Sequence, residues 1–403
     1  MLFLISKRSK RKFKKALRKI LPMALVGLVA ISAVALHSKI FLSTFGQEIE
    51  LSQTDLWFRL RGVKPPPQEI VVVAMDELTY SELGISTLDP LPRAMIAEML
   101  EALAESGIKL AILDMFFRDI GTNPEVDQRL ARAIGLSPTF IGSFQINDPS
   151  SKKNEIKLLE VLPRPEFASR AERVAMMNLV GDDKIRIFTP AKPAQDRNPP
   201  LPVAYAAREP KKSLPSPFDL INYYGPPGSI LRVSAYEILR NDPSNNRAIF
   251  SGKTILVGSA LAAMTGFTIK DSFANPTSSS QMGGVEIHAT IVGNILKGEW
   301  IRRFSPVWEL PALNVLAVLF CALIFRLSPL SGLGLTLAVL VTWSLGAYWA
   351  FLHETFIPGV NLVWVIFPCV FSLAVLLKHR VLNSRYLQVQ EMLGGSGISP
   401  DKT

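Results

Sequence analysis

Long apolar runs near both ends of the chain, uncharged except for Glu309, predict helices that cross a membrane. The first runs from Ile20 to His37 and can extend to Leu42 if the Lys39 amine reaches toward the headgroups. Three further runs lie near the other end, at 306–325, 327–352 and 355–377. A span needs roughly 20 apolar residues, a length that these runs approach or exceed. We therefore expect four transmembrane helices, one before and three after a long central region; buried helices of a soluble protein are the alternative for the last three.

The central region alternates between strand-like and helix-like patterns. Apolar, β-branched runs of strand length occur at 69–75, 109–113 and 139–146. Between them, apolar residues recur at helical spacing from Arg93 to Ser106, and Asn123-Pro124 has the form of a helix start. Such alternation is typical of a parallel sheet covered on both faces. We therefore predict an α/β domain with a mostly parallel sheet covered by helices.

The second half of the central region is less regular. Gly181–Lys184 has the composition of a hairpin turn, and the proline-rich stretch 190–217 predicts a wrapping connection with one short helix. Asp219–Tyr224 and Thr254–Ala260 are predicted strands, and a last helix is expected from Gly284 to a stop at Gly298.

The distribution of charge argues against a DNA-binding domain and orients the chain. The net charge of +10 comes from residues 1–42, which hold ten Lys and Arg and no acid, whereas the rest carries 34 charges of each sign. No folded segment therefore has the positive field that nucleic acid requires. Because cytoplasmic flanks are rich in Lys and Arg, the cluster Lys7–Lys19 and the basic residues from Lys378 predict cytoplasmic ends.

These boundaries divide the chain into seven segments. They are a basic cytoplasmic tail (1–19), the first transmembrane helix (20–42), an extracytoplasmic domain (43–305), three transmembrane helices (306–325, 327–352 and 355–377) and a cytoplasmic tail (378–403). The stretch 55–62 predicts a short helix at the start of the outer domain. Ala33-Val34-Ala35 also resembles a signal-cleavage site, so removal of the first segment is the alternative to a permanent anchor.

Motifs for metal, cofactor or nucleotide chemistry are weak in this sequence. Cys321 and Cys369 fall in predicted membrane helices, and His288 is the only histidine of the outer domain, so we expect no disulfide framework and no metal site. Gly252-Lys253-Thr254 lacks the first glycine of a phosphate loop, since Arg247 stands there, and a strand rather than a helix follows. With no nucleophile–base pair apparent, we predict neither a cofactor nor an enzyme.

Acidic residues follow two predicted strands and suggest a ligand cleft. Asp76 and Glu77 close the run 69–75, and Asp114 closes the run 109–113. Ligands of open α/β sheets bind outside the carboxyl ends of strands, where Arg93 is also within reach if the two strands are neighbours. The alternative is a structural role, in which these carboxylates cap helices or pair with Arg93.

Several stretches in order resemble one known family. They are Asp55–Gly62, Ile70–Glu77, Leu91–Arg93, Gly107–Phe117, Asn222–Gly228, Gly252–Ser259 and Gly284–Ala289. Together they are similar to the second type of CHASE domain, the extracytoplasmic sensors associated with bacterial cyclases and histidine kinases. Asp89 and Leu91 stand where the family usually has tryptophans, which puts an aromatic platform in doubt. Family receptors continue into an output domain after the last helix, whereas only 25 residues follow Lys378 here.

The resemblance implies a bacterial inner-membrane sensor that works as a homodimer. We expect an unknown small molecule or ion as its ligand and a separate cyclase or kinase as its effector. The lipid bilayer is a further expected partner, and nucleic acid is not. The rival interpretations are a membrane-tethered extracytoplasmic enzyme and a structural envelope protein.

Overall fold

The structure is a computed structural model that describes residues 7–87, 89–147, 158–179, 184–187, 198–209, 214–261 and 271–394. It divides into a helical unit, Met1–Gln53 with Phe304–Thr403, and a sheet domain, Thr54–Arg303. The helices are α1 Lys7–Phe41, α2 Thr44–Arg61, α3 Glu77–Leu83, α4 Arg93–Glu105, α5 Pro124–Ile134, α6 Pro165–Ala168, α7 Leu201–Arg208, α8 Ala235–Arg240, α9 Pro243–Phe250, α10 Gly284–Lys297, α11 Pro306–Ile324, α12 Pro329–Leu352, the π-helical turn η1 Asn361–Ile366 and α13 Phe367–Gly394. The strands are β1 Ile70–Met75, β2 Leu110–Asp114, β3 Thr139–Asn147, β4 Leu158–Val161, β5 Arg173–Met176, β6 Arg232–Ser234, β7 Thr254–Ser259, β8 Ser272–Phe273 and β9 Met282–Gly283.

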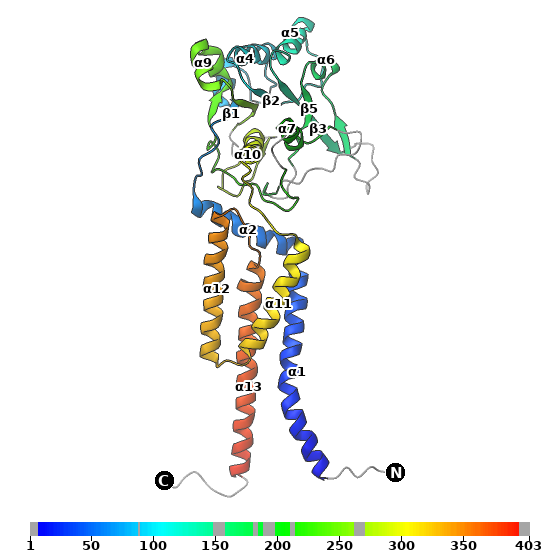
Figure 1. The fold of residues 1–403 in the computed structure, drawn as a ribbon, viewed down its shortest axis with the longest axis vertical. Helices are drawn as coiled ribbons and strands as arrows, with labels where there is room; N and C mark the ends of the chain where they lie inside the picture. The colour runs from blue at the N-terminus through cyan, green and yellow to red at the C-terminus, as the bar shows by residue number, and fades with distance from the viewer. Residues whose placement is uncertain are drawn as a thin grey trace. The chain divides into compact units, whose positions relative to one another are not determined.

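Within the described part of the sheet domain, seven strands form one sheet (Figure 1). Their order is β4-β3-β2-β7-β1-β6, and β5 pairs with β3 beside this path. Every pair is parallel except β3 with β4. In the centre, Val257 of β7 lies opposite both Val73 and Leu113. The predicted α/β class with a mostly parallel sheet is therefore confirmed.

The two faces of the sheet bury different side chains, because successive residues of a strand point to opposite faces. Val73, Leu113 and Val257 belong to the core that the sheet shares with α4, α5 and α8. Gly258 belongs to the other face, where a Cβ atom would come within 2.8 Å of Val285 in α10. In Figure 1, α4 and α5 accordingly lie on one side of the sheet and α10 on the other.

Local sequence explains the helices that cover the sheet. In α4 the predicted apolar positions, among them Ile96 and Leu103, are buried. Asn123 caps α5, its side chain accepting a hydrogen bond from the Glu125 amide at 2.9 Å, as the Asn-Pro signal predicts. Every residue of α10 from Gly284 to Ile295 is buried, as expected of a helix that is apolar on nearly all sides.

The segment Asp219–Tyr224 corrects a prediction. It forms only isolated bridges, from Leu220 to Ile187 and Ile301, and not a strand. An α10 side chain replaces the sheet ladder, since Asn294 accepts from the Asn222 amide at 2.9 Å and donates to its carbonyl at 3.0 Å. The short helix expected within 190–217 is α7. Of the hairpin turn expected at Gly181–Lys184, residues 181–183 lie outside the described residues.

α2 is longer than the short helix expected at 55–62. Its C-terminal part, which belongs to the sheet domain, is fixed there by buried ionic contacts. Arg186 donates from Nε to Asp55 Oδ1 at 2.9 Å and from Nη2 to Oδ2 at 3.0 Å, and Lys184 also pairs with this carboxylate. Arg61 donates to Asn222 Oδ1 at 2.7 Å.

The helical unit holds the four expected spans. Among the described residues, four helices are long and apolar enough to cross a membrane, over Met23–Phe41, Pro306–Ile324, Pro329–Leu352 and Asn361–Ser384. The last begins later than the predicted 355–377 and continues without a break to Gly394, because no Pro or Gly interrupts the chain from Cys369 to Leu393. Both cysteines lie in these helices and are unbridged, Cys321 in α11 and Cys369 in α13.

Polar contacts join the helices of this unit. His37 of α1 shares a 2.9 Å hydrogen bond with Asn314 of α11. Fully buried Glu50 accepts hydrogen bonds from the backbone amides of Gly359, Val360 and Asn361 at 2.8, 3.2 and 2.9 Å. A carboxylate in this place is favourable because the amides of a helix start lack intrahelical partners.

Candidate functional site

A cavity of about 610 Å³ lies at the carboxyl ends of β1 and β2. It is bounded by Met75 at the end of β1, by residues 115–117 just after β2, by residues 90–94 at the start of α4 and by the loop 119–123. This is the edge of the sheet at which open α/β proteins bind their ligands. We call it the Arg93 cavity.

The lining of the Arg93 cavity is largely apolar. Tyr80, Leu91 and Phe116 are among its side chains, and the charged groups are Arg93, Asp119 and Asp127. An apolar wall with a few polar groups is the usual composition of small-molecule sites, and the volume lies within their usual range of roughly 300–1,000 Å³.

Arg93 is held in place by α5 and by the loop before it. Its Nη1 donates to Asp127 Oδ1 at 2.7 Å, and its Nη2 donates to the Asp119 carbonyl at 2.5 Å. The guanidinium also lies over the Phe167 ring, 5.5 Å from its centroid. Asp127 Oδ2 accepts from the Gly121 amide at 2.9 Å, so this carboxylate joins the arginine to the loop. A Cβ atom at Gly121 would approach Asp127 to 2.4 Å, which explains the glycine.

Asp76 and Glu77 lie at the start of α3. Asp76 Oδ1 accepts from the Thr79 amide at 3.1 Å and from Ser234 Oγ at 2.8 Å, and the carboxylate is 3.6 Å from Arg232. Glu77 is exposed in the first turn. Neither lines the Arg93 cavity, and Asp76 has the geometry of a helix cap.

Asp114 lies on the opposite face of the sheet from Arg93. Its neighbour Met115 lines the Arg93 cavity, whereas Asp114 itself packs toward α10, its Cβ 3.1 Å from the place of a Gly258 Cβ. The alternation of side chains along β2 separates the two residues. The structure therefore does not bring Asp114 together with Arg93.

A different set of titratable groups surrounds Asp114. Its Oδ2 is buried and has no hydrogen-bond partner among the described residues, and burial raises the pKa of this carboxyl to about 7. Burial, and then the charge of Asp114, raises the pKa of Asp271 to about 7. His288 donates from Nε2 to the Met177 carbonyl at 2.9 Å, and burial lowers the pKa of its imidazole. No group of three or more His, Cys, Asp or Glu among the described residues is arranged to hold a metal ion.

Asp127 and Asp271 were not among the residues singled out from the sequence. Asp127 had a usable signal, since it recurs with Leu130, Ala131 and Ile134 on the buried face of α5, where a carboxylate needs a partner. No comparable pattern marks Asp271.

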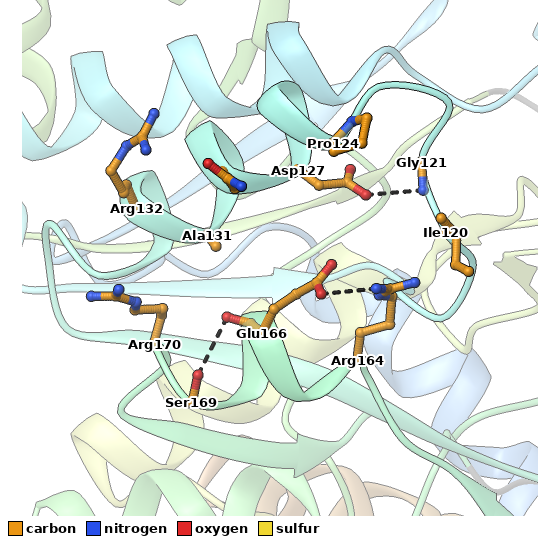
Figure 2. A pocket seen from close by; sticks show the side chains of 11 residues that line it. Ile120, Gly121, Pro124, Asp127, Ala131, Arg132, Arg164, Glu166, Ser169 and Arg170 are labelled. Atoms are coloured by element: carbon orange, nitrogen blue, oxygen red, sulfur yellow. Dashed lines mark hydrogen bonds and ion pairs between the residues drawn. The ribbon is translucent and has the colours of Figure 1, made fainter.

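A second cavity of about 550 Å³ lies between α5 and the segment 164–170 (Figure 2). It shares Ile120, Gly121 and Asp127 with the Arg93 cavity. Three arginines line it, Arg132, Arg164 and Arg170. We call it the three-arginine cavity.

Comparison with known proteins gives one match. The family model described as the CHASE2 domain matches residues 26–325. No curated protein and no solved structure matches the chain.

Proposed function

Because the chain belongs to the CHASE2 domain family, we propose that its sheet domain binds a small molecule in the Arg93 cavity and signals through the membrane helices to an effector. CHASE2 is a sensory extracellular domain family, and four helices of this chain are suited to cross a membrane. The protein is thus a membrane-associated sensor. We propose in addition where the ligand binds, how the chain is oriented in the membrane and which kind of effector it acts on.

The position and lining of the Arg93 cavity carry the proposal. The cavity lies at the carboxyl edge of a parallel sheet, at the ends of β1 and β2, which β7 separates, and it combines an apolar wall with one fixed guanidinium. Of the four residues predicted to form the ligand cleft, Arg93 lines this cavity, and we propose that it contacts the ligand. Asp76, Glu77 and Asp114 do not line the cavity. Leu91, at a position where the resemblance implied an aromatic residue, forms part of the wall.

The proposed orientation places residues 43–305 outside the cytoplasm of a bacterial inner membrane and both ends of the chain inside. The positive cluster Lys7–Lys19 supports it. In this arrangement α10 leads within a few residues into α11, so a ligand-dependent shift of the sheet domain has a short covalent route to a membrane helix. We propose a homodimer that acts on a cyclase or kinase. A ligand changes signalling only if it binds the two states with different affinity.

The test is a thermal-shift screen of the full chain in nanodiscs against a small-molecule library. Compounds that stabilise the chain are retested on Phe116→Ala, which removes an apolar side chain, 42% exposed, from the cavity wall. The control is Leu78→Ala, which removes an apolar side chain of similar exposure, 40%, from α3 outside the cavity. We expect a loss of about tenfold or more in affinity in the first variant only, from about 1.4 kcal/mol of lost contact. Equal affinities in both variants would refute the site, and chemical turnover of a stabilising compound would favour the enzyme interpretation.

A further inference from the structure

The three-arginine cavity carries more positive than negative charge. Its two carboxylates are already engaged: Asp127 with Arg93 and the Gly121 amide, and Glu166 with Arg164 Nη2 at 2.8 Å. In the described part of the chain, Arg132 and Arg170 have no carboxylate within ion-pairing distance. The cavity therefore has two guanidinium groups that form no ion pair with a described carboxylate, although Arg132, after Arg129, helps to lower the pKa of the more distant Glu101 carboxyl.

These two arginines come from different elements to the same end of the cavity. Arg132 lies in the last turn of α5, and Arg170 follows α6. A Cβ atom built at Gly135 would lie 3.4 Å from the Arg132 carbonyl and 3.8 Å from Cβ and Cδ of Arg170, which places the Arg170 stem against the end of α5. In Figure 2 they lie at one end of the cavity, with Arg164 toward the other and the Glu166 carboxylate between them.

Arg164 adds a further unsatisfied donor. Its Nε is buried and has no acceptor among the described residues, although Nη2 is bonded to Glu166. Its backbone is fixed, because its amide donates to the Phe117 carbonyl at 2.9 Å. Guanidinium groups bind carboxylate and phosphate oxygens through paired hydrogen bonds, and charge-assisted bonds of this kind are shorter and stronger than neutral ones.

We propose that the three-arginine cavity is a second ligand site, which takes a small soluble oxyanion bearing a carboxylate or phosphate group. Arg132 and Arg170 bind the anionic group, and Glu166 competes with the ligand for Arg164. This site differs from the apolar Arg93 cavity in the chemistry that it recognises. The oxyanion site does not depend on whether a ligand binds in the Arg93 cavity.

The experiment uses the full chain in phosphatidylcholine nanodiscs and measures its unfolding temperature during titration with inorganic phosphate or succinate. Sodium chloride at matched ionic strength is the reference, because screening alone changes surface electrostatics. We expect saturable stabilisation by at least one oxyanion. The double variant Arg132→Gln/Arg170→Gln should weaken its binding by about tenfold or more. Arg240→Gln/Arg247→Gln removes the same charge from exposed sites on α8 and α9 and should leave binding unchanged.

Glu166→Gln should raise the affinity for the oxyanion, whereas the Arg132/Arg170 variant lowers it. It releases Arg164 and removes a competing negative charge, so oxyanion binding should become about two- to fivefold tighter, the range expected from one exposed ion pair. Phe116 does not line the three-arginine cavity, so Phe116→Ala should leave oxyanion binding unchanged. The two proposed sites can therefore be tested separately. The proposal is overturned if neither oxyanion stabilises beyond chloride, if the Arg132/Arg170 and Arg240/Arg247 variants respond alike, or if Glu166→Gln weakens binding.

Discussion

Asp114→Asn should stabilise the sheet domain, and the gain should be much larger at pH 8 than at pH 5. The wild-type carboxyl is the unusual group, because its Oδ2 is buried without a hydrogen-bond partner in the described part of the chain, and its charge acts on a second carboxyl, that of half-buried Asp271. Asparagine keeps the shape of the side chain and never acquires the charge. The variant therefore isolates the cost of ionising a carboxyl in this place.

The magnitude follows from the pKa of Asp114, which burial raises from 3.8 to about 7. Between these values the folded state holds a proton that the unfolded state has lost, so the free energy of unfolding falls as pH rises from about 4 to 7 and is constant above. At about 1.36 kcal/mol for each pH unit, the full effect is about 4 kcal/mol. This is an upper bound, because Asp114 as a whole is only partly buried. Loss of its charge also removes one cause of the raised pKa of Asp271, which adds to the gain in the same direction.

The assay is thermal unfolding of the full chain in nanodiscs at pH 5 and pH 8. A domain of this size gains roughly 2–4 °C for each kcal/mol, so Asp114→Asn should unfold up to about 8–16 °C higher than wild type at pH 8. Exposed Glu82→Gln, which also removes one carboxylate, is the control and should show no such difference. An equal effect of Asp114→Asn at both pH values, or a loss of stability at pH 8, would show that the carboxyl is not held neutral by burial.

Three further predictions concern topology and structural contacts. Reporters fused after residue 150 and after residue 400 should report opposite sides of the membrane, and the same side for both contradicts the four-span orientation. Arg93→Met should lower the free energy of unfolding by about 3 kcal/mol because it leaves the buried Asp127 carboxylate without its ion-pair partner. The loss should appear as faster hydrogen exchange at 119–121. Adding Asp127→Leu to this variant should recover part of the lost stability. Glu50→Ala removes the acceptor of three backbone amides and should cost about 2 kcal/mol or more, seen as faster exchange in η1, whereas unchanged exchange would contradict the capping role.

The candidate site shows where local patterns stop being sufficient. The sequence predicts that the ends of the two strands share one rim with a helix start if the strands are neighbours. β7 lies between them, yet Met75 at the end of β1 and Arg93 do line one cavity. The pattern did not show which face each side chain takes. Asp114 ends its strand pointing to α10, and its neighbour Met115 points to the cavity, because side chains alternate along a strand. Asp127, the partner of Arg93, is distant in the sequence, and only the packing of α5 on α4 brings the two together.

The sequence by itself determined the class of element at most positions, because burial imposes a periodicity on each element. Long apolar runs with at most one charge specified four membrane helices, shorter apolar runs specified the central strands, and Asn123-Pro124 specified the start of α5. Tertiary structure decided the contacts that no local pattern encodes. The placing of β7 between β1 and β2, and the replacement of a strand at Asp219–Tyr224 by hydrogen bonds from Asn294, depend on residues far apart in the chain. The same holds for the charges of the two cavities. Whether an arginine there forms an ion pair depends on which carboxylates the fold brings beside its guanidinium.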